Sequence, residues 1–185
     1  KRLVLADVNG DGLSDVIYLS EPIRVWINLG IDTKNHARGR FAAPFFISTG
    51  LLDSFTTFRI ADINGNGSTD VVWNASSNGQ LSIAYIDFSP NAQPCQLKKI
   101  NNGIGGITNI KYRSSVIDMV RDRDAGKPWS EGVPFPVSVV ESVEITDGRN
   151  SYYTEFNYHD GYYDGKEKEF RGFARVEKVA KGDST

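Results

Sequence analysis

The sequence predicts an all-β protein, and three observations indicate it. An apolar segment, a polar loop and a second apolar segment at residues 2–19 recur at residues 57–74, so that Asp7 matches Asp62 at an offset of 55 residues. Several other segments alternate apolar and polar residues with a period of two, which is typical of half-buried strands. Finally, 10 Phe, 8 Tyr and 3 Trp beside a single Met favour strands over helices.

Each copy of the repeat predicts a similar series of short strands. The apolar run before the loop, the apolar run after it and a following alternating segment each have strand character. In order, these segments are residues 3–5, 16–18 and 23–30 in the first copy, and residues 58–60, 71–73 and 80–88 in the second. A polar loop at residues 30–40 separates the first copy from a further strand that contains Pro44, and this proline indicates an edge or a bulge.

The sequence Pro90–Pro94 predicts a domain boundary, because the 55-residue pattern stops there. Beyond it, a glycine-rich turn precedes a predicted strand at residues 107–112. A short helical turn follows and is ended by Gly126 and Pro128. Long strands are then predicted near residues 135–146, 152–158 and 169–180, with a turn at residues 147–150 and turn signals at Asp-Gly 160–161 and 164–165.

The loop of the repeat resembles a calcium-binding loop. Calcium prefers six to eight oxygen ligands, and donors at positions 1, 3, 5, 7 and 9 can wrap a chain round one ion. In the first loop these donors are Asp7, Asn9, Asp11, the carbonyl of Leu13, and Asp15. In the second they are Asp62, Asn64, Asn66, the carbonyl of Ser68, and Asp70.

An EF-hand is excluded, since Tyr18 stands where that loop needs a bidentate Glu and the flanks are strands. Asn66 replaces an aspartate, which predicts weaker calcium binding by the second loop. The alternative is a pair of metal-free turns, because Asp and Asn side chains accept hydrogen bonds from nearby backbone N–H groups.

The repeat resembles the FG-GAP or VCBS repeat, which is related to the blades of integrin α-subunit propellers. The resemblance covers residues 1–92 and rests on the DxNxDGxxD loop, the segment VWINLG and the sequence GRF. It implies four-stranded antiparallel blades. Because a closed propeller takes four to eight blades, two copies would form part of one. The chain is therefore expected to be a piece of a longer protein.

Residues 97–180 resemble the middle region of the B component of Tc insecticidal toxins, between the SpvB-type and propeller regions and the Rhs-repeat shell. The segments NNGIGGITNIKYRSS, RDRDAGKPW, PFPVSVVESVE and YHDGYYDGKEKEFRGFARVE occur in that order. The resemblance implies a large bacterial toxin subunit whose propeller docks on the pore-forming A component and whose Rhs part forms a β-shell around a toxic effector. Its expected partners are the other toxin subunits and the rest of its own chain.

Three further groups of polar residues are candidate sites. The charged run Arg121–Lys127 is interpreted as a solvated turn rather than a partner contact, with Trp129 anchoring it through its ring. His159 near Asp160 and Asp164 suggests acid–base chemistry, but ordinary turn chemistry explains both Asp-Gly pairs better. Arg171 and Arg175 are interpreted as residues of a shell strand and are expected to pair with Glu167 and Glu169.

Composition excludes several classes of function. The net charge of −2 gives no basic footprint for nucleic acid, and no apolar run reaches the ~18 residues that span a bilayer. The lone Cys95 rules out a disulfide framework within the chain. We therefore expect a non-enzymatic structural and interaction segment of a secreted or cell-surface bacterial toxin. The alternative is a calcium-stabilised surface adhesin or carbohydrate-binding propeller module.

Overall fold

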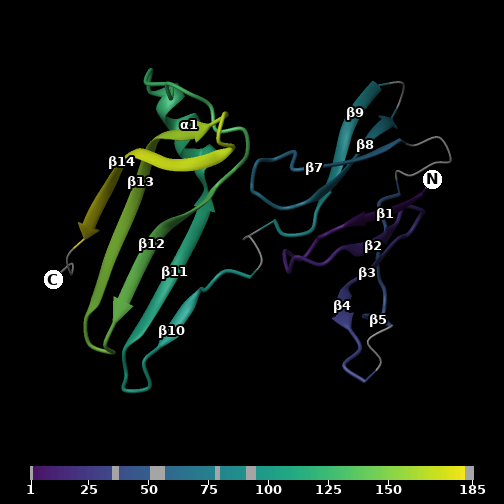
Figure 1. The fold of residues 1–185 in the computed structure, drawn as a ribbon, viewed down its shortest axis with the longest axis horizontal. Helices are drawn as coiled ribbons and strands as arrows, with labels where there is room; N and C mark the ends of the chain where they lie inside the picture. Colours follow the sequence, from purple (N-terminus) through teal and green to yellow (C-terminus); the bar gives the residue numbers. More distant parts are fainter. Residues whose placement is uncertain (1, 35–37, 51–56, 78–79, 91–94, 182–185) are drawn as a thin grey trace. The chain divides into compact units, whose positions relative to one another are not determined.

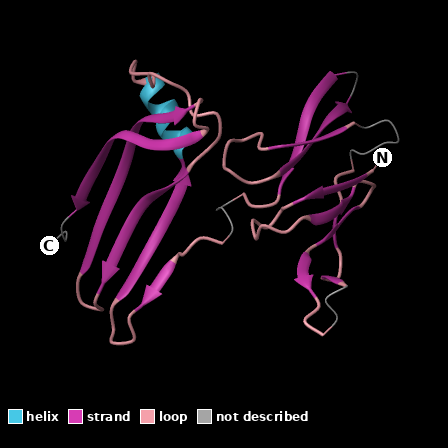
Figure 2. Cartoon of the chain, in the orientation of Figure 1, coloured by secondary structure: helices cyan, strands magenta, loops and turns pink. Residues whose placement is uncertain are grey.

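The structure is a computed structural model that describes the 185-residue chain except residues 1, 35–37, 51–56, 78–79, 91–94 and 182–185. Antiparallel strands make up most of the described chain, with one helix, which confirms the predicted all-β class (Figure 2). The chain forms two compact units. The first comprises Lys1–Asn64 and Ser68–Cys95, and the second comprises Gln96–Thr185 with Gly65–Gly67.

The first unit contains the two copies of the repeat. Its strands are β1 (Leu3–Ala6), β2 (Asp15–Tyr18), β3 (Ile23–Trp26), β4 (Asn28–Ile31), β5 (Gly39–Phe41), β6 (Phe45–Ile47), β7 (Phe58–Ala61), β8 (Asp70–Ser77) and β9 (Gln80–Asp87). The first copy forms a four-stranded antiparallel sheet in the order β1-β2-β3-β6. The second forms a three-stranded sheet in the order β7-β8-β9.

The two sheets share one hydrophobic core. The fully buried side chains are Val8, Ile17, Leu19, Ile23, Val25, Val71 and Trp73, with Phe58 packed against them. Because Val4 pairs with Ile17 and Ile17 pairs with Val25, the core-facing residues of the first sheet lie on one face. The opposite face of that sheet exposes Leu3 and Leu5.

The two sheets present opposite faces of the repeat to this core. At the 55-residue offset, Phe58 and Trp73 correspond to Leu3 and Tyr18. Phe58 and Trp73 belong to the core, whereas Leu3 is 58% exposed on the far face of its sheet. The second copy therefore buries Phe58 and Trp73 on the face that the first copy leaves uncovered, although Ile60, at the position of Leu5, is still 40% exposed.

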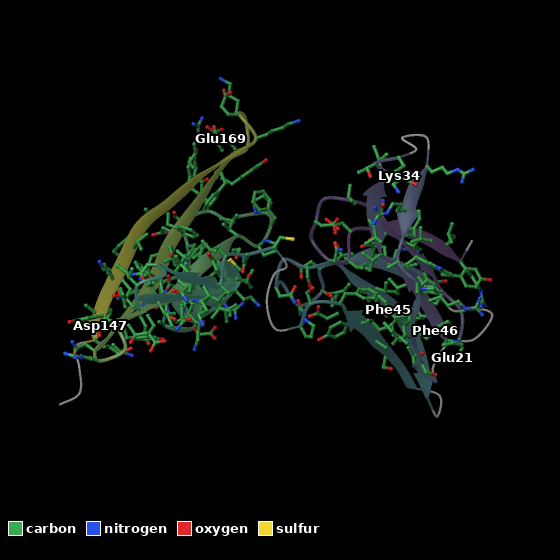
Figure 3. The ribbon with its side chains drawn as sticks, turned by 90° about the horizontal axis from the view of Figure 1, so that it is seen from below. Glu21, Lys34, Phe45, Phe46, Asp147 and Glu169 are labelled. Carbon is green, nitrogen blue, oxygen red and sulfur yellow. The ribbon has the colours of Figure 1, made fainter. Side chains whose placement is uncertain are left out.

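The structure differs from the sequence prediction at residues 23–30, where one continuous strand was expected. The segment divides into β3, which belongs to the first sheet, and β4, which pairs with β5 in a separate two-stranded ribbon (Figure 1). The break falls where the N–H of Asn28 turns to the buried carboxylate of Asp15, at 2.7 Å. Phe45 and Phe46 lie on β6, in the segment where Pro44 predicted an edge strand (Figure 3).

The second unit is a five-stranded antiparallel sheet in sequence order, β10-β11-β12-β13-β14 (Figure 1). Its strands are β10 (Lys99–Asn101), β11 (Ile107–Ser114), β12 (Ser138–Thr146), β13 (Ser151–Asp164) and β14 (Glu169–Lys181). The turn predicted at residues 147–150 joins β12 to β13, and Asp147 Oδ1 accepts the N–H groups of Arg149 and Asn150. The described strands β10 and β14 form the two edges of this sheet.

The helix α1 (Ser115–Asp124) follows β11 directly and packs on β11 and β13. Its N-cap is Ser114, whose hydroxyl accepts the N–H of Val116 at 3.2 Å. The predicted helical turn is thus confirmed and is longer than expected, and it ends just before Gly126, which adopts a φ of 74°.

The turn predicted at Asp160-Gly161 is wrong, because both residues lie inside the continuous strand β13. Asp160 adopts a φ of 50° there and accepts the N–H of Ser130 at 2.8 Å. The sequence therefore marks an irregularity in a strand rather than its end. The actual β13–β14 turn begins at Asp164, whose Oδ1 accepts the N–H groups of Lys166 and Glu167.

Candidate functional site

The first predicted calcium loop is closed by its own hydrogen bonds. The Asp7 carboxylate accepts the N–H groups of Gly10, Asp11 and Gly12 at 2.7, 3.3 and 2.8 Å. Gly10 and Gly12 have φ values of 68° and 85°, which glycine adopts readily. Asp11 in turn accepts the N–H of Leu13 at 2.8 Å. Asp7 and Asp11, two of the candidate calcium ligands, are thus brought into one tight turn.

Asn9 and Asp15 complete the first loop in different ways. The Asn9 amide donates to Asp11 Oδ2 at 2.9 Å, near the surface. Asp15 is fully buried, and its two oxygens accept the N–H groups of Val8 and Asn28 at 2.9 and 2.7 Å. Both Asp15 oxygens therefore stabilise backbone that would otherwise carry unpaired buried donors.

In the second loop a residue outside the motif takes part. Asp87, on β9, accepts hydrogen bonds from the Asn64 amide at 2.8 Å and the Ser68 hydroxyl at 3.0 Å. The buried Asp70 accepts the N–H of Ile63 at 2.9 Å through Oδ2. Its Oδ1 is buried and has no hydrogen-bond partner among the described residues.

The electrostatics of this second loop differ from those of the first. Burial raises the pKa of the Asp70 carboxyl, and the charges of Asp87 and Asp62 add to that rise, while the N–H groups of Ile63 and Asn64 oppose it. Asn66 lies in the same loop, as the motif predicted. Asp87 could not be identified from the motif, since only the pairing of β8 with β9 places it opposite Asp70.

The donor chemistry of both loops suits a hard cation, but much of it is already engaged. Within the described ranges, no group of three or more His, Cys, Asp or Glu side chains is arranged to hold a metal ion. Carboxylate oxygens keep a second lone pair after accepting one N–H group, so calcium could still bind to the surface oxygens. Calcium binding by the loops thus stays a prediction.

A network of ionic side chains joins α1 to the sheet of the second unit. Asp118 is fully buried and accepts hydrogen bonds from Arg113 Nε at 3.0 Å and from Arg121 Nη1. Arg113 also donates to the carbonyl of Phe156, and Arg121 donates to the carbonyl of Tyr158 at 3.1 Å. Two guanidinium groups therefore tie β11 and α1 to β13 through one carboxylate.

Asp122, one turn further along α1, holds His159 of β13. His159 Nδ1 lies 2.7 Å from Asp122 Oδ2, and Trp129 Nε1 donates to the same oxygen at 2.9 Å. Arg121 donates to Asp122 Oδ1. Burial alone would raise the pKa of Asp122, but the hydrogen bonds from Trp129, Arg121 and His159 outweigh it, so the pKa of this carboxyl is lowered.

A cavity of about 440 Å³ lies beside this group. Its lining residues are Asp122, Ala125, Lys127, Trp129, His159, Asp160, Arg175 and Glu177. Three carboxylates, two cationic side chains and His159 line it, and the Trp129 ring packs edge-on against Phe173 at 5.8 Å between centroids. The cavity is therefore polar and mixed in charge, and one aromatic wall is fixed in place.

The structure corrects the interpretation of the charged run Arg121–Lys127 as a solvated turn. Asp122 is buried and Arg121 is half-buried, whereas Arg123 and Asp124 form the exposed pair that was expected. The expected role of Trp129 as an anchor agrees with its contacts. The helical spacing of Asp118 and Asp122, at i and i+4, was the signal that could have placed both on one buried face.

The acid–base hypothesis for His159 with Asp160 and Asp164 does not match the geometry. His159 pairs with Asp122, while Asp160 binds Ser130 and Asp164 lies 3.6 Å from Arg171. The expected pairing of Glu169 with Arg171 is present at 3.0 Å.

Among the residues that the structure describes, no helix is long and apolar enough to cross a membrane.

Solved structures of Tc toxin complexes are similar to the whole chain. A Tc holotoxin pore from Photorhabdus luminescens, with a variant of its TccC3 component, superposes with a TM-score of 0.81 at 26% identity. The TcdB2–TccC3 complex gives a TM-score of 0.77 at 28% identity, and the same complex without its hypervariable C-terminal region gives 0.78 at 26%. Each match covers 99% of this chain and 9% of the other.

The chain thus spans about a tenth of the length of these toxin chains. No curated protein sequence gives a significant match. The family described as the insecticide toxin TcdB middle/N-terminal region matches residues 33–185, which is most of the chain. This match agrees with the resemblance carried by residues 97–180, and it extends into the first unit. The chain therefore belongs to the TcdB middle/N-terminal family of insecticidal toxin proteins, as a segment of a Tc toxin B component.

Proposed function

We propose that this chain is a non-enzymatic structural and interaction segment of an exported Tc-type toxin B component. Its first unit contributes blades to a propeller that docks the pore-forming A component. Its second unit contributes strands to the β-shell that encloses the effector. The observations that carry the proposal are the exposed apolar side chains on one face of the first sheet and, among the described strands, the pairing of β14 on one side only.

In the first unit, the evidence is the uncovered face of the first sheet. Leu3, Leu5 and Phe46 are 58, 64 and 60% exposed, whereas Phe58 and Trp73, the second-copy residues at the positions of Leu3 and Tyr18, belong to the core. Large contiguous apolar surface on one side of a sheet marks a packing interface. The natural occupant is another copy of the same repeat, because the chain itself shows how one copy packs on the next.

In the second unit, the evidence is the free edge of β14. This strand has 13 residues and is paired on one side, by β13. A long unpaired edge presents a row of free N–H and C=O groups, and natural proteins pair or protect such edges. We infer that a further strand of the parent protein pairs with β14 and continues the sheet into the shell.

The β4–β5 ribbon is the part of the first unit that best suits docking. Its two strands pair with each other and with neither of the larger sheets of the unit. The ribbon exposes Leu29, Ile31 and Phe41 at 48, 61 and 46%. A short ribbon that exposes apolar side chains adds little to the core of its own blade. It therefore presents a surface on which a partner subunit can bury apolar area.

Hydrogen exchange on the intact B component tests the structural part of the proposal. Amides on the outer edge of β14 should be protected as strongly as those of β12, because both would be paired. Rapid exchange along that edge of β14 in the intact protein would contradict the shell role.

Photo-crosslinking tests the docking part. A photoreactive residue at Ile31 of the intact B component should crosslink to the A component, whereas one at Ile104 should not. Ile104 is 90% exposed at the β10–β11 turn of the second unit and is the matched control. Absence of crosslinks from Leu29, Ile31 and Phe41 would contradict docking through this ribbon.

A further inference from the structure

We propose that the cavity beside α1 is a binding site for a divalent transition-metal ion, with His159 Nε2 and the Glu177 carboxylate as the ligands supplied by this chain. The site is independent of the docking and shell roles. It rests on an unpaired ring nitrogen, a carboxylate within reach and a buried residue that fixes the histidine.

The first step is the state of the His159 ring. Its Nδ1 lies 2.7 Å from the Asp122 carboxylate and 3.4 Å from Arg121 Nη2, and the shorter contact favours the neutral ring whose Nδ1 carries the proton and donates it to Asp122. Nε2 then bears a lone pair. This atom is buried and has no hydrogen-bond partner among the described residues. A buried acceptor without a partner is unfavourable, and a cation bound to it would relieve that cost.

The second step is the position of Glu177. Its Oε2 lies 3.7 Å from His159 Nε2, and its Oε1 is held by Arg175 at 2.9 Å. In a tetrahedral zinc site with bonds of about 2.0–2.1 Å, two ligand atoms lie roughly 3.3 Å apart. Glu177 is 45% exposed, so a small rotation of its side chain closes the difference.

The third step is the support of the histidine by Asp122. Metal-binding histidines usually donate their other N–H to a carboxylate or carbonyl, which fixes the ring and raises its basicity. Asp122 meets this requirement and is itself fixed by the Trp129 indole and by Arg121. The rigid part of the site therefore exists before a metal arrives.

The ligand set also selects the class of metal. Imidazole with one carboxylate suits Zn²⁺ and its neighbours, whereas Ca²⁺ and Mg²⁺ prefer oxygen alone. Two ligands leave positions for water, and a cavity of about 440 Å³ has room for it. Lys127 and Arg175 line the same cavity, and their charges should keep the affinity moderate.

Titration of the full chain with Zn²⁺, and with Co²⁺ as a spectroscopic probe, tests the proposal. Wild-type protein should bind one ion and give a Co²⁺ absorption spectrum typical of nitrogen and oxygen ligands. His159→Ala should abolish that spectrum, and Glu177→Gln should weaken binding at least tenfold. Asp122→Asn should weaken it about 10–100-fold, as loss of a supporting carboxylate does at other metal sites.

Two controls keep the result specific. Glu169→Gln changes another exposed glutamate of β14, one that pairs with Arg171, and should bind as the wild type does. His36→Ala removes the other of the chain's two histidines and should also leave binding unchanged. Failure of the wild type to bind Zn²⁺ or Co²⁺, or binding that survives in His159→Ala, would overturn the proposal.

Discussion

Asp70 lies directly opposite Asp87 in the antiparallel pairing of β8 and β9. Two carboxylates in this position repel each other, and one of them is fully buried. The equivalent residue of the first copy, Asp15, has no carboxylate opposite it and has both oxygens paired with backbone N–H groups. The same motif residue therefore stabilises one copy and carries an electrostatic cost in the other.

Asp70→Asn is expected to stabilise the first unit at neutral pH by about 1 kcal/mol. The amide removes a buried charge that Asp87 and Asp62 repel, and its oxygen can still accept the N–H of Ile63 that Oδ2 now accepts. Asp15→Asn is the matched control and should destabilise by about 1–3 kcal/mol, since its amide N–H₂ would face a backbone donor. Urea unfolding followed by tryptophan fluorescence measures both, and a destabilising Asp70→Asn would contradict the account.

The advantage of Asp70→Asn should also depend on pH. The folded pKa of Asp70 is raised, so its protonated form stabilises the fold below its ordinary pKa of 3.8, and this contribution is lost as the pH rises through the folded pKa. The stability difference between Asp70→Asn and wild type should therefore grow from pH 3 to pH 7. A difference that stays constant over this range would exclude a titrating Asp70 as its cause.

Calcium should raise the melting temperature of the chain if the loops hold it, because a ligand that binds the folded state stabilises that state. Asp11→Ala should reduce the rise more than Asn66→Ala, since Asp11 contributes a charge to the first loop. Differential scanning fluorimetry with millimolar calcium, and with magnesium as a control, measures the shift. No shift with calcium would mean that both loops are turns closed by their own hydrogen bonds.

Asp118→Asn should destabilise the second unit by about 3–5 kcal/mol, because it leaves Arg113 and Arg121 without their buried carboxylate. Asp124→Asn is the control on the same helix. The side chains of its ion pair with Arg123 are both exposed, Arg123 at 63% and Asp124 at 64%, so the pair should contribute less than about 1 kcal/mol to the free energy of unfolding. Thermal unfolding monitored through Trp129 compares them, and equal effects would refute the special role of Asp118.

Gly161→Ala should destabilise the second unit by about 1–3 kcal/mol. A Cβ at Gly161 would lie 2.8 Å from both the Trp129 ring and the Val133 side chain. Gly165→Ala is the control in the second Asp-Gly pair, since its Cβ would meet no atom within 4 Å. It should be neutral or slightly stabilising in the same unfolding assay, and similar losses for both variants would contradict the steric explanation.

Local chemistry explains which parts of the fold could be predicted from the sequence. Alternation of apolar residues located the long strands, and Asp147 with its neighbours predicted a turn that the structure contains. The family resemblance of residues 97–180 was carried by segments whose order is specific, and it is confirmed by the family match. These signals are local, so one sequence suffices to find them.

The parts that could not be predicted depend on contacts between distant segments. Asp160-Gly161 has the composition of a turn, but the pairing of β13 with β14 continues past it, and Ser130 satisfies Asp160. The charged run of α1 has the composition of a solvated surface, yet His159 and Arg113 lie against it. In both cases a tertiary contact decides the role of a residue whose local preference is different.

The order of the strands in the second unit bears on how the polypeptide acquires its shape. Each strand from β11 to β14 pairs with the strand that precedes it in the chain, and α1 forms between β11 and β12. The β10–β11, β12–β13 and β13–β14 pairings each close a connection of four or five residues, which keeps the entropic cost low and formation fast, whereas the β11–β12 pairing closes over α1 and the segment that follows it. A growing chain on the ribosome can therefore add this sheet one strand at a time, so that the order of synthesis is also a workable order of folding.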